Sequence, residues 1–148
     1  MEFRGVKIIM QYWLIKTEPN TWSWQNQLNV KKTEWDGVRN YQARNNLNKM
    51  KKGDLCFFYH SVYEKKIIGV VKVVKESYPD TTDKSNKFTS VDISAYIQLK
   101  RPVSLEDKKA HNKLKHLALV KQSRLSVMPI DSKSWYIILR LSKTNIKN

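Results

Sequence analysis

Four segments of the sequence combine aromatic, amide, hydroxyl and cationic side chains at points where apolar stretches end. In one of them Trp35 offers a flat apolar face, Arg39 can fork onto a phosphate, and Asn40 carries a donor and an acceptor for a base edge. Stacking faces surrounded by cations are the groups that nucleobase recognition requires. The four segments are residues 12–19 (YWLIKTEP), 35–41 (WDGVRNY), 57–61 (FFYHS) and 122–127 (QSRLSV).

The same side chains also have a purely structural explanation. Trp35 can belong to the hydrophobic core, Asn40 can cap the helix that follows it, and Arg39 can be an ordinary surface residue. On this segment alone the two interpretations are of similar weight, and both stay open.

The other segments favour a functional site because their polar residues stand at the ends of predicted strands. Lys16, His60 and Ser61 end two strands, while Arg124 and Ser126 lie in a third extended stretch. We expect these groups to converge on one mouth of a small barrel. Such an arrangement would form an aromatic-walled pocket with a positively charged rim.

The charge balance points to the same class of partner. The 28 Lys and Arg residues exceed the 13 Asp and Glu residues, which leaves a formal net charge of +15 at pH 7. A field of that size concentrates polyanions around a protein, so a nucleic acid is the expected partner. Many lysines serve only solubility. That explanation does not cover the tryptophans, because Trp13, Trp22, Trp24 and Trp35 all fall within the first quarter of the 148 residues.

Several other kinds of chemistry have no support in the sequence. The four isolated glycines form neither a dinucleotide-binding turn nor a phosphate-binding loop, so we expect no cofactor. The three histidines lack neighbours at ligand spacing, so we expect no metal site. The single cysteine, Cys56, lies in an apolar run and suits a buried position.

No part of the sequence has the character of a membrane span or a secretory signal. No apolar run approaches the ~18 to 20 residues that cross a bilayer, and the first ten residues lack the apolar stretch of a signal peptide. We therefore expect no membrane partner. The expected compartment is the cytoplasm of a bacterium or the nucleus of a eukaryote.

The elements that must position these residues follow from hydrophobic periodicity and capping signals. Residues 91–99 alternate apolar and polar side chains and predict the clearest strand. About five strands among short helices, without a regular βαβ alternation, predict an α+β domain with a small, strongly bent mixed sheet. The other expected elements are strands over 12–15, 54–60 and 66–75, an extended stretch over 122–128, helices over 23–28, 40–50 and 114–119, after Pro102 and from about 132, and loops over 31–34 and 78–87.

Seven motifs occur in the order that is typical of one known family. The chain resembles the EVE domain, a member of the PUA-like superfamily, over residues 10–143, with an extension over 1–9 and a tail over 144–148. The resemblance implies a PUA-like pseudobarrel, related to YTH domains, whose pocket takes a flipped base that carries a modification. The implied ligands are methylated or hydroxymethylated cytosine and methylated adenine. The motifs are YWLIKTEP, WDGVRNYQARNNL, FFYHS, IIGVVKVVKESYPD, VDI, PVSLED and QSRLSVMPI.

The residues and the resemblance together predict a set of site residues. The resemblance implies Trp35 as a wall of the pocket and Asn40 and Ser61 as hydrogen-bonding groups. Phe88 stands where the family commonly has a Trp, so this chain lacks one indole donor there. The predicted base pocket is Trp35, Asn40, Tyr41, Tyr59, His60, Ser61, Phe88 and Ser126, and the predicted phosphate or charged lining is Lys16, Arg39, Arg44 and Arg124.

Three functions are compatible with these patterns. The first is a non-enzymatic reader of modified DNA or RNA bases, which we expect to be a monomer. The second is an enzyme acting on nucleic acid or nucleosides, similar to ASCH-domain hydrolases or ribonucleases, in which Lys16, Glu18, Tyr59 and His60 supply the acid and base. The third is an RNA- or ribosome-associated adaptor whose binding ignores base modification.

Overall fold

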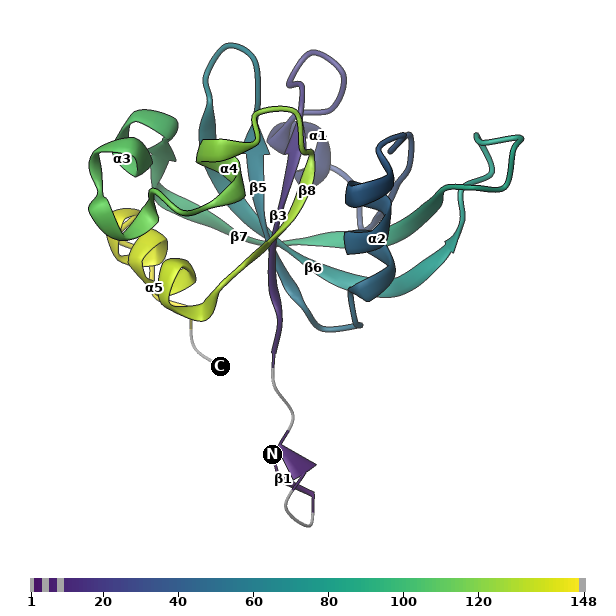
Figure 1. The fold of residues 1–148 in the computed structure, drawn as a ribbon, viewed down its shortest axis with the longest axis horizontal. Helices are drawn as coiled ribbons and strands as arrows, with labels where there is room; N and C mark the ends of the chain where they lie inside the picture. Colours follow the sequence, from purple (N-terminus) through teal and green to yellow (C-terminus); the bar gives the residue numbers. More distant parts are fainter. Residues whose placement is uncertain (1, 4–5, 8–9, 147–148) are drawn as a thin grey trace.

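One bent mixed sheet forms the centre of the protein (Figure 1). The computed structural model describes residues 2–3, 6–7 and 10–146, and within these the main sheet has six strands in the order β4-β7-β6-β5-β3-β8. β3 and β5 are parallel, and the other neighbours are antiparallel. The strands are β3 (Tyr12–Thr17), β4 (Thr33–Trp35), β5 (Leu55–His60), β6 (Lys66–Pro79), β7 (Thr89–Ser104) and β8 (Val127–Ile130), beside a separate antiparallel pair of β1 (Glu2–Phe3) and β2 (Val6–Lys7).

Short helices surround this sheet. Figure 1 shows α2 on one side of the sheet and α3, α4 and α5 gathered on the other. Ser23 and Asn26 cap α1 reciprocally, and the Asn40 side chain accepts a hydrogen bond from the Ala43 amide at the start of α2. The helices are α1 (Trp24–Leu28), α2 (Tyr41–Lys49), α3 (Leu105–Ala110), the 3₁₀ turn η1 (Asn112–Leu114), α4 (Ala118–Lys121) and α5 (Ser132–Leu141). Among the described residues no helix combines the length and apolar character that crossing a bilayer needs.

Aromatic side chains fill the core on both faces of β5. On one face Phe57 stacks on Trp135 of α5, with ring centres 4.0 Å apart. On the other, Phe58 forms T-shaped contacts with Trp24 and Trp35, with ring centres 5.2 and 5.8 Å apart. Gly69 of β6 makes this packing possible, because a Cβ at that position would lie 2.4 Å from the Trp24 ring. The Phe57 face thus packs against α5, and the Phe58 face packs against α1 and the edge strand β4.

The predicted fold class is confirmed, and the main sheet has one strand more than expected. The prediction of a polar loop over residues 31–34 is wrong, because β4 begins at Thr33 and pairs Trp35 with Val91 of β7. A three-residue edge strand has polar residues on its free side, so its composition resembles that of a loop. The long β6 and β7 bend through four irregularities in their pairing, which curve the sheet without closing a barrel.

One other expectation changes with the structure. Residues 122–128 are not extended throughout, since a turn in which the Leu125 amide donates to the Gln122 carbonyl precedes β8. Thr144, at the start of the predicted tail, is 4% exposed and accepts a hydrogen bond from the Lys100 amide. Of the predicted extension and tail, residues 1, 4–5, 8–9 and 147–148 lie outside the described residues.

Candidate nucleic-acid interface

A cleft of about 660 Å³ opens where the C-terminal end of β3 approaches β4 and the segment that leads into α2. This volume lies within the usual range of pockets for small ligands. Its walls come from three stretches of chain that are distant in sequence, residues 16–22, 33–40 and 126. The lining residues are Lys16, Thr17, Glu18, Thr21, Trp22, Thr33, Glu34, Trp35, Asp36, Gly37, Val38, Arg39, Asn40 and Ser126.

Two indoles contribute to the walls of the cleft. Trp35, the last residue of β4, is 9% exposed and packs against Phe58 in a T-shaped contact. Trp22 is half-buried, and its Nε1 donates to Gln27 Oε1 over 2.9 Å. The Thr17 hydroxyl donates to the Trp22 carbonyl over 2.6 Å, which ties the loop to the end of β3. Both rings are therefore fixed before any ligand arrives.

The segment between β4 and α2 is anchored by one buried carboxylate, that of Asp80. Its Oδ2 accepts from the Gly37 amide at 2.8 Å and from Arg39 Nη1 at 3.0 Å. Burial alone would raise the pKa of Asp80, but hydrogen bonds from Thr82, Gly37 and Arg39 lower it to about 2. Gly37 has φ +78°, a left-handed conformation that favours glycine. Asp80 therefore holds this wall of the cleft in place and neutralises Arg39.

Lys16 joins the end of β3 to the turn before β8. Its Nζ donates to the Ser123 carbonyl over 2.9 Å, and its backbone amide donates to the Ser126 carbonyl over 2.9 Å. Burial lowers the pKa of Lys16 below the ordinary lysine value. The ammonium group also lies 5.9 Å from the Tyr59 ring centre. These contacts bring Ser126 to the cleft and fix a cation at its rim.

The structure brings five of the twelve predicted site residues together at the cleft: Lys16, Trp35, Arg39, Asn40 and Ser126. Asn40 also caps α2, so its structural and functional interpretations are compatible. Arg124 lines an adjoining hollow of about 310 Å³, and Asn40 belongs to both hollows.

Three predicted residues at the end of β5 also lie outside the cleft lining. Tyr59 is 3% exposed, and burial raises its pKa to about 12. His60 accepts a hydrogen bond at Nε2 from the Trp24 amide, and its Nδ1 lies 2.9 Å from Glu64 Oε1. The Ser61 hydroxyl donates to the Thr17 carbonyl. The Ser61 hydroxyl thus joins the ends of β3 and β5, and His60 orients the start of α1.

The remaining three predicted residues form a separate group, here called the Tyr41 cluster and made of Tyr41, Arg44 and Phe88. Tyr41 is 52% exposed and stacks on Phe88, with ring centres 5.1 Å apart. The Arg44 guanidinium lies 4.8 Å from the Tyr41 ring centre. None of the three lines the cleft.

Sequence reasoning did not select Trp22, Glu34 or Asp36 as site residues. The crowding of tryptophans near the N-terminus was the signal that pointed to Trp22. Carboxylate oxygens of Glu34, Asp36 and Asp80 lie within 4.8 Å of one another, a spacing at which a metal ion can bind. Two of these residues are already engaged, Asp80 by Gly37 and Arg39 and Glu34 by the Ser90 hydroxyl. We therefore assign this group to the support of the wall.

The bent sheet and its cleft define a PUA-like domain. A YTH domain of Zygosaccharomyces rouxii aligns with a TM-score of 0.55 over 99% of this chain and 94% of that one. Its 18% identity establishes a common fold only. The chain belongs to the EVE domain family, whose family profile matches residues 11–141.

Relatives of the chain are found in bacteria and eukaryotes. Mouse thymocyte nuclear protein 1 is 37% identical over 174 aligned residues, which cover 95% of this chain and 77% of that protein. A crystal structure from Agrobacterium tumefaciens is 44% identical, with a TM-score of 0.87 over 90% of this chain and 94% of that one. Human thymocyte nuclear protein 1, solved in complex with DNA containing 5-methylcytosine, is 33% identical with a TM-score of 0.84, over 92% of this chain and 99% of that one.

Proposed function

We propose that this protein reads modified nucleic acid by taking one flipped base into the cleft beside Trp35. The observation that carries the proposal is the composition of the cleft, in which two indoles, amide and hydroxyl groups and a fixed cation surround one opening. An extruded base needs an aromatic face for stacking and polar groups for its edge, while cations hold the backbone on either side. The net charge of +15 supports the same partner.

The human relative indicates which base to test first. Because that protein was solved with DNA containing 5-methylcytosine, 5-methylcytosine is the leading ligand for this chain. Hydroxymethylated cytosine and methylated adenine are the alternatives. Trp35 and Trp22 would supply the stacking faces, Asn40 and Ser126 the polar groups, and Lys16 with Arg124 the contacts to phosphate.

A binding panel tests the proposal directly. Otherwise identical DNA and RNA strands, each with one modified or unmodified base at a central position, are titrated with the intact protein. An added methyl group that fills an apolar pocket changes affinity about 10-fold or more, so one modified base should stand out by that factor. Equal affinity for every strand would contradict a reader and favour the adaptor.

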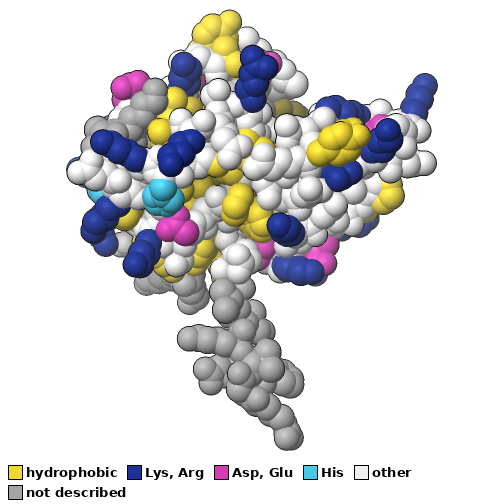
Figure 2. All heavy atoms as spheres, viewed as in Figure 1, with side chains coloured by type: hydrophobic (Ala, Val, Ile, Leu, Met, Phe, Trp, Pro, Cys, Tyr) yellow, Lys and Arg dark blue, Asp and Glu magenta, His cyan; other side chains and the backbone are white. Residues whose placement is uncertain are grey.

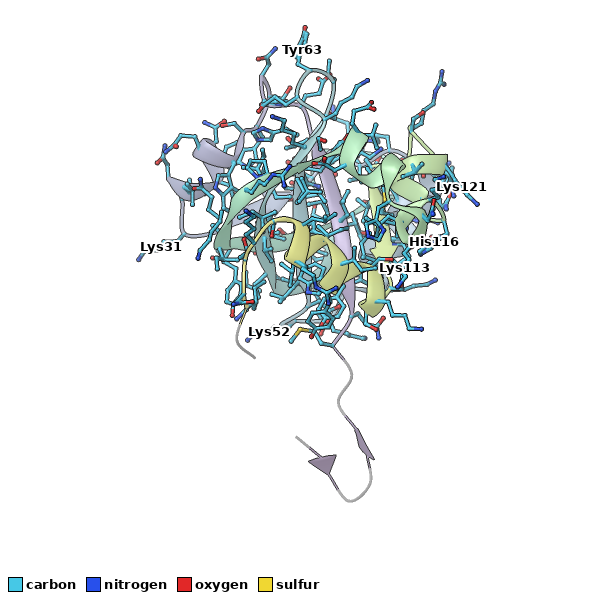
Figure 3. The ribbon with its side chains drawn as sticks, turned by 90° about the vertical axis from the view of Figure 1, so that its left-hand side faces the viewer. Lys31, Lys52, Tyr63, Lys113, His116 and Lys121 are labelled. Atoms are coloured by element: carbon cyan, nitrogen blue, oxygen red, sulfur yellow. The ribbon has the colours of Figure 1, made fainter. Side chains whose placement is uncertain are left out.

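Two variants at Trp35 locate the base. Trp35→Ala should weaken binding about 5- to 150-fold, because stacking of one base contributes ~1 to 3 kcal/mol. Trp35→Phe keeps an aromatic ring against Phe58 and should weaken binding less than Trp35→Ala does. Tyr63→Ala is the matched control, since Tyr63 lies in the turn between β5 and β6, is 77% exposed and points away from the body of the protein (Figure 3). Unchanged affinity of both Trp35 variants would remove this residue from the site.

The positions of the residues that an enzyme would use also favour a binding module. Of the four residues that an acid–base mechanism would use, Lys16 and Glu18 line the cleft, while Tyr59 and His60 do not. The two ring nitrogens of His60 are both engaged by Trp24 and Glu64. Incubation with RNA, modified nucleosides and a divalent metal tests the enzyme. Turnover that Lys16→Ala abolishes would overturn the binding module.

The state of the protein in the cell belongs to the same proposal. We infer a monomer that acts without a cofactor or a membrane partner, in the cytoplasm of a bacterium or the nucleus of a eukaryote. Light scattering should give a mass near 17.5 kDa for the free protein, and that mass plus one oligonucleotide when a short oligonucleotide is bound. A mass of twice that value would contradict the monomer.

A further inference from the structure

The Tyr41 cluster is an aromatic surface that the cleft does not use. Half of the Tyr41 side chain is exposed at the first position of α2, whereas Phe88 beneath it is 8% exposed. Figure 2 shows a hydrophobic patch over α2 with Lys and Arg side chains around it. An exposed tyrosine held against a second ring and a guanidinium differs from an isolated surface tyrosine, because its orientation is already fixed.

The distances within the cluster leave one face of Tyr41 open. The Tyr41 and Phe88 ring centres are 5.1 Å apart, and the Arg44 guanidinium carbon lies 4.8 Å from Tyr41 and 6.0 Å from Phe88. If Phe88 and Arg44 covered opposite faces of Tyr41, they would be separated by nearly the sum of their distances to it. Their short separation means that they approach Tyr41 from the same side. The opposite face of the Tyr41 ring is therefore the exposed one.

Hydrogen bonds make the cluster rigid. Arg44 Nη1 donates to the Lys87 carbonyl over 2.8 Å, and Arg44 Nη2 donates to Asn45 Oδ1 over 2.8 Å. The Lys87 and Phe88 amides donate to Asp83 Oδ2 over 2.8 and 2.9 Å. A ring whose support is held in this way loses little conformational entropy when a flat ligand stacks on it.

The cluster is continuous with the cleft. Arg39 and Asn40 line the cleft, and Tyr41 is the next residue of the chain. The Arg39 guanidinium carbon also lies 5.4 Å from the Phe88 ring centre, so one cation connects the two regions. A nucleic-acid strand that places one base in the cleft therefore passes close to Tyr41 with the neighbouring nucleotide.

We propose that the open face of Tyr41 is a second stacking site, which binds the unpaired base next to the one in the cleft. The proposal rests on the proposed function, since it needs a nucleic-acid ligand. Stacking on one face addresses the π-surface that every base has, so this site tolerates any base. Arg44 supports the ring and places a positive charge beside the phosphate of the same nucleotide.

The experiment uses single-stranded DNA with a central 5-methylcytosine. In one strand thymines flank this base on both sides, and in two others an abasic site replaces the 5′ or the 3′ neighbour. Tyr41→Ala should weaken binding of the thymine-flanked strand about 5- to 150-fold. One of the two abasic strands lacks the base that stacks on Tyr41. Wild type and Tyr41→Ala should bind that strand with equal affinity. Tyr41→Phe should bind every strand as wild type does, because the ring remains.

The controls separate stacking from general damage. Tyr63→Ala removes a tyrosine that is still more exposed and should bind all three strands as wild type does. An alanine is well tolerated at an exposed helix position, so Tyr41→Ala should retain the wild-type melting temperature. The second stacking site is contradicted if Tyr41→Ala binds the thymine-flanked strand normally, or if it loses the same factor on all three strands.

Failure of this proposal and failure of the proposed function give different results. Equal binding of cytosine and 5-methylcytosine by wild-type protein would contradict the reader. The dependence of the Tyr41→Ala effect on the neighbouring base would still support stacking at Tyr41. Conversely, a strong preference for 5-methylcytosine that Tyr41→Ala leaves intact on every strand would support the cleft and overturn the second site.

Discussion

The cleft and the Tyr41 cluster both combine aromatic rings with arginine, yet they are built in different ways. Trp35 ends a strand of the main sheet and packs against Phe58, so its position depends on the whole core. Tyr41 stands in the first turn of α2 and rests on a residue of the loop before β7. A site built into a sheet holds its ligand in one orientation, whereas a ring on a helix surface offers a stacking face alone. The difference predicts that the cleft discriminates between bases and that the Tyr41 cluster accepts any base.

The largest expected difference between the two regions is in folding stability. Trp35→Ala removes a 9% exposed indole from the core and should lower the free energy of unfolding by about 3–5 kcal/mol. Tyr41→Ala removes a half-exposed ring and should change it by no more than about 0.5 kcal/mol. Urea unfolding followed by far-UV circular dichroism measures both. Similar losses for the two variants would mean that Tyr41 also belongs to the core.

A smaller loss of folding stability is expected when the anchor of the cleft wall is removed. Asp80→Asn weakens the acceptor for the Gly37 amide and removes the ion pair with Arg39. The variant should lower the free energy of unfolding by about 1–3 kcal/mol. Because Arg39 also lies beside Phe88, this variant should weaken binding at both regions. If Asp80→Asn weakens binding only of strands with a modified central base, the cleft depends on Asp80 and the Tyr41 cluster does not.

The pH dependence of stability provides an independent measure of the same anchor. The pKa of Asp80 is lowered from 3.8 to about 2, so its contribution is fully present above pH 4 and is lost as the pH falls towards 2. Asp131 also has a pKa lowered to about 2, so some acid sensitivity remains in any case. Wild type should therefore lose more stability than Asp80→Asn between pH 4 and pH 2. Parallel profiles would contradict the role of Asp80.

The salt dependence of binding should distinguish the two arginines near the cleft. Arg124 is exposed, and Asp80 neutralises Arg39, so Arg124 is the better contact for phosphate. Arg124→Ala should reduce the slope of log affinity against log salt by about 0.7 to 0.9, and Arg39→Ala by less. Lys52→Ala is the control, because Lys52 precedes β5 and the cleft lies at the opposite end of the parallel β3–β5 pair. Equal slopes for Arg39→Ala and Arg124→Ala would contradict this distinction.

The smallest effect is expected at Arg44. Arg44→Lys keeps the charge but loses the planar group that lies over Tyr41, so it should weaken binding by a few-fold without changing the salt slope. Unchanged affinity of Arg44→Lys would show that Arg44 acts through its charge alone. Titrations of the thymine-flanked strand at several salt concentrations measure both quantities.

Local signals in the sequence were sufficient for several elements. The spacing of Ser23 and Asn26 predicts the cap of α1, and Asn40 predicts the start of α2, because each cap uses hydrogen bonds within three residues. The strands predicted over residues 54–60 and 91–99 follow from their apolar content and alternation. The order of the motifs was sufficient for the family, since seven of them in sequence are far more specific than any one.

The tertiary structure alone decided which predicted residues share a site. Asp80 reaches back 43 positions to the Gly37 amide, and no local pattern reveals such a bond. The strand β4 exists because β7 offers a free edge to Thr33–Trp35, which a window of polar residues cannot show. Tyr41 and Asn40 are adjacent in sequence, yet the start of α2 turns one side chain onto Phe88 and leaves the other at the cleft. Hydrogen bonds within a turn depend on neighbouring residues, whereas the shape of a cleft depends on how distant strands pair.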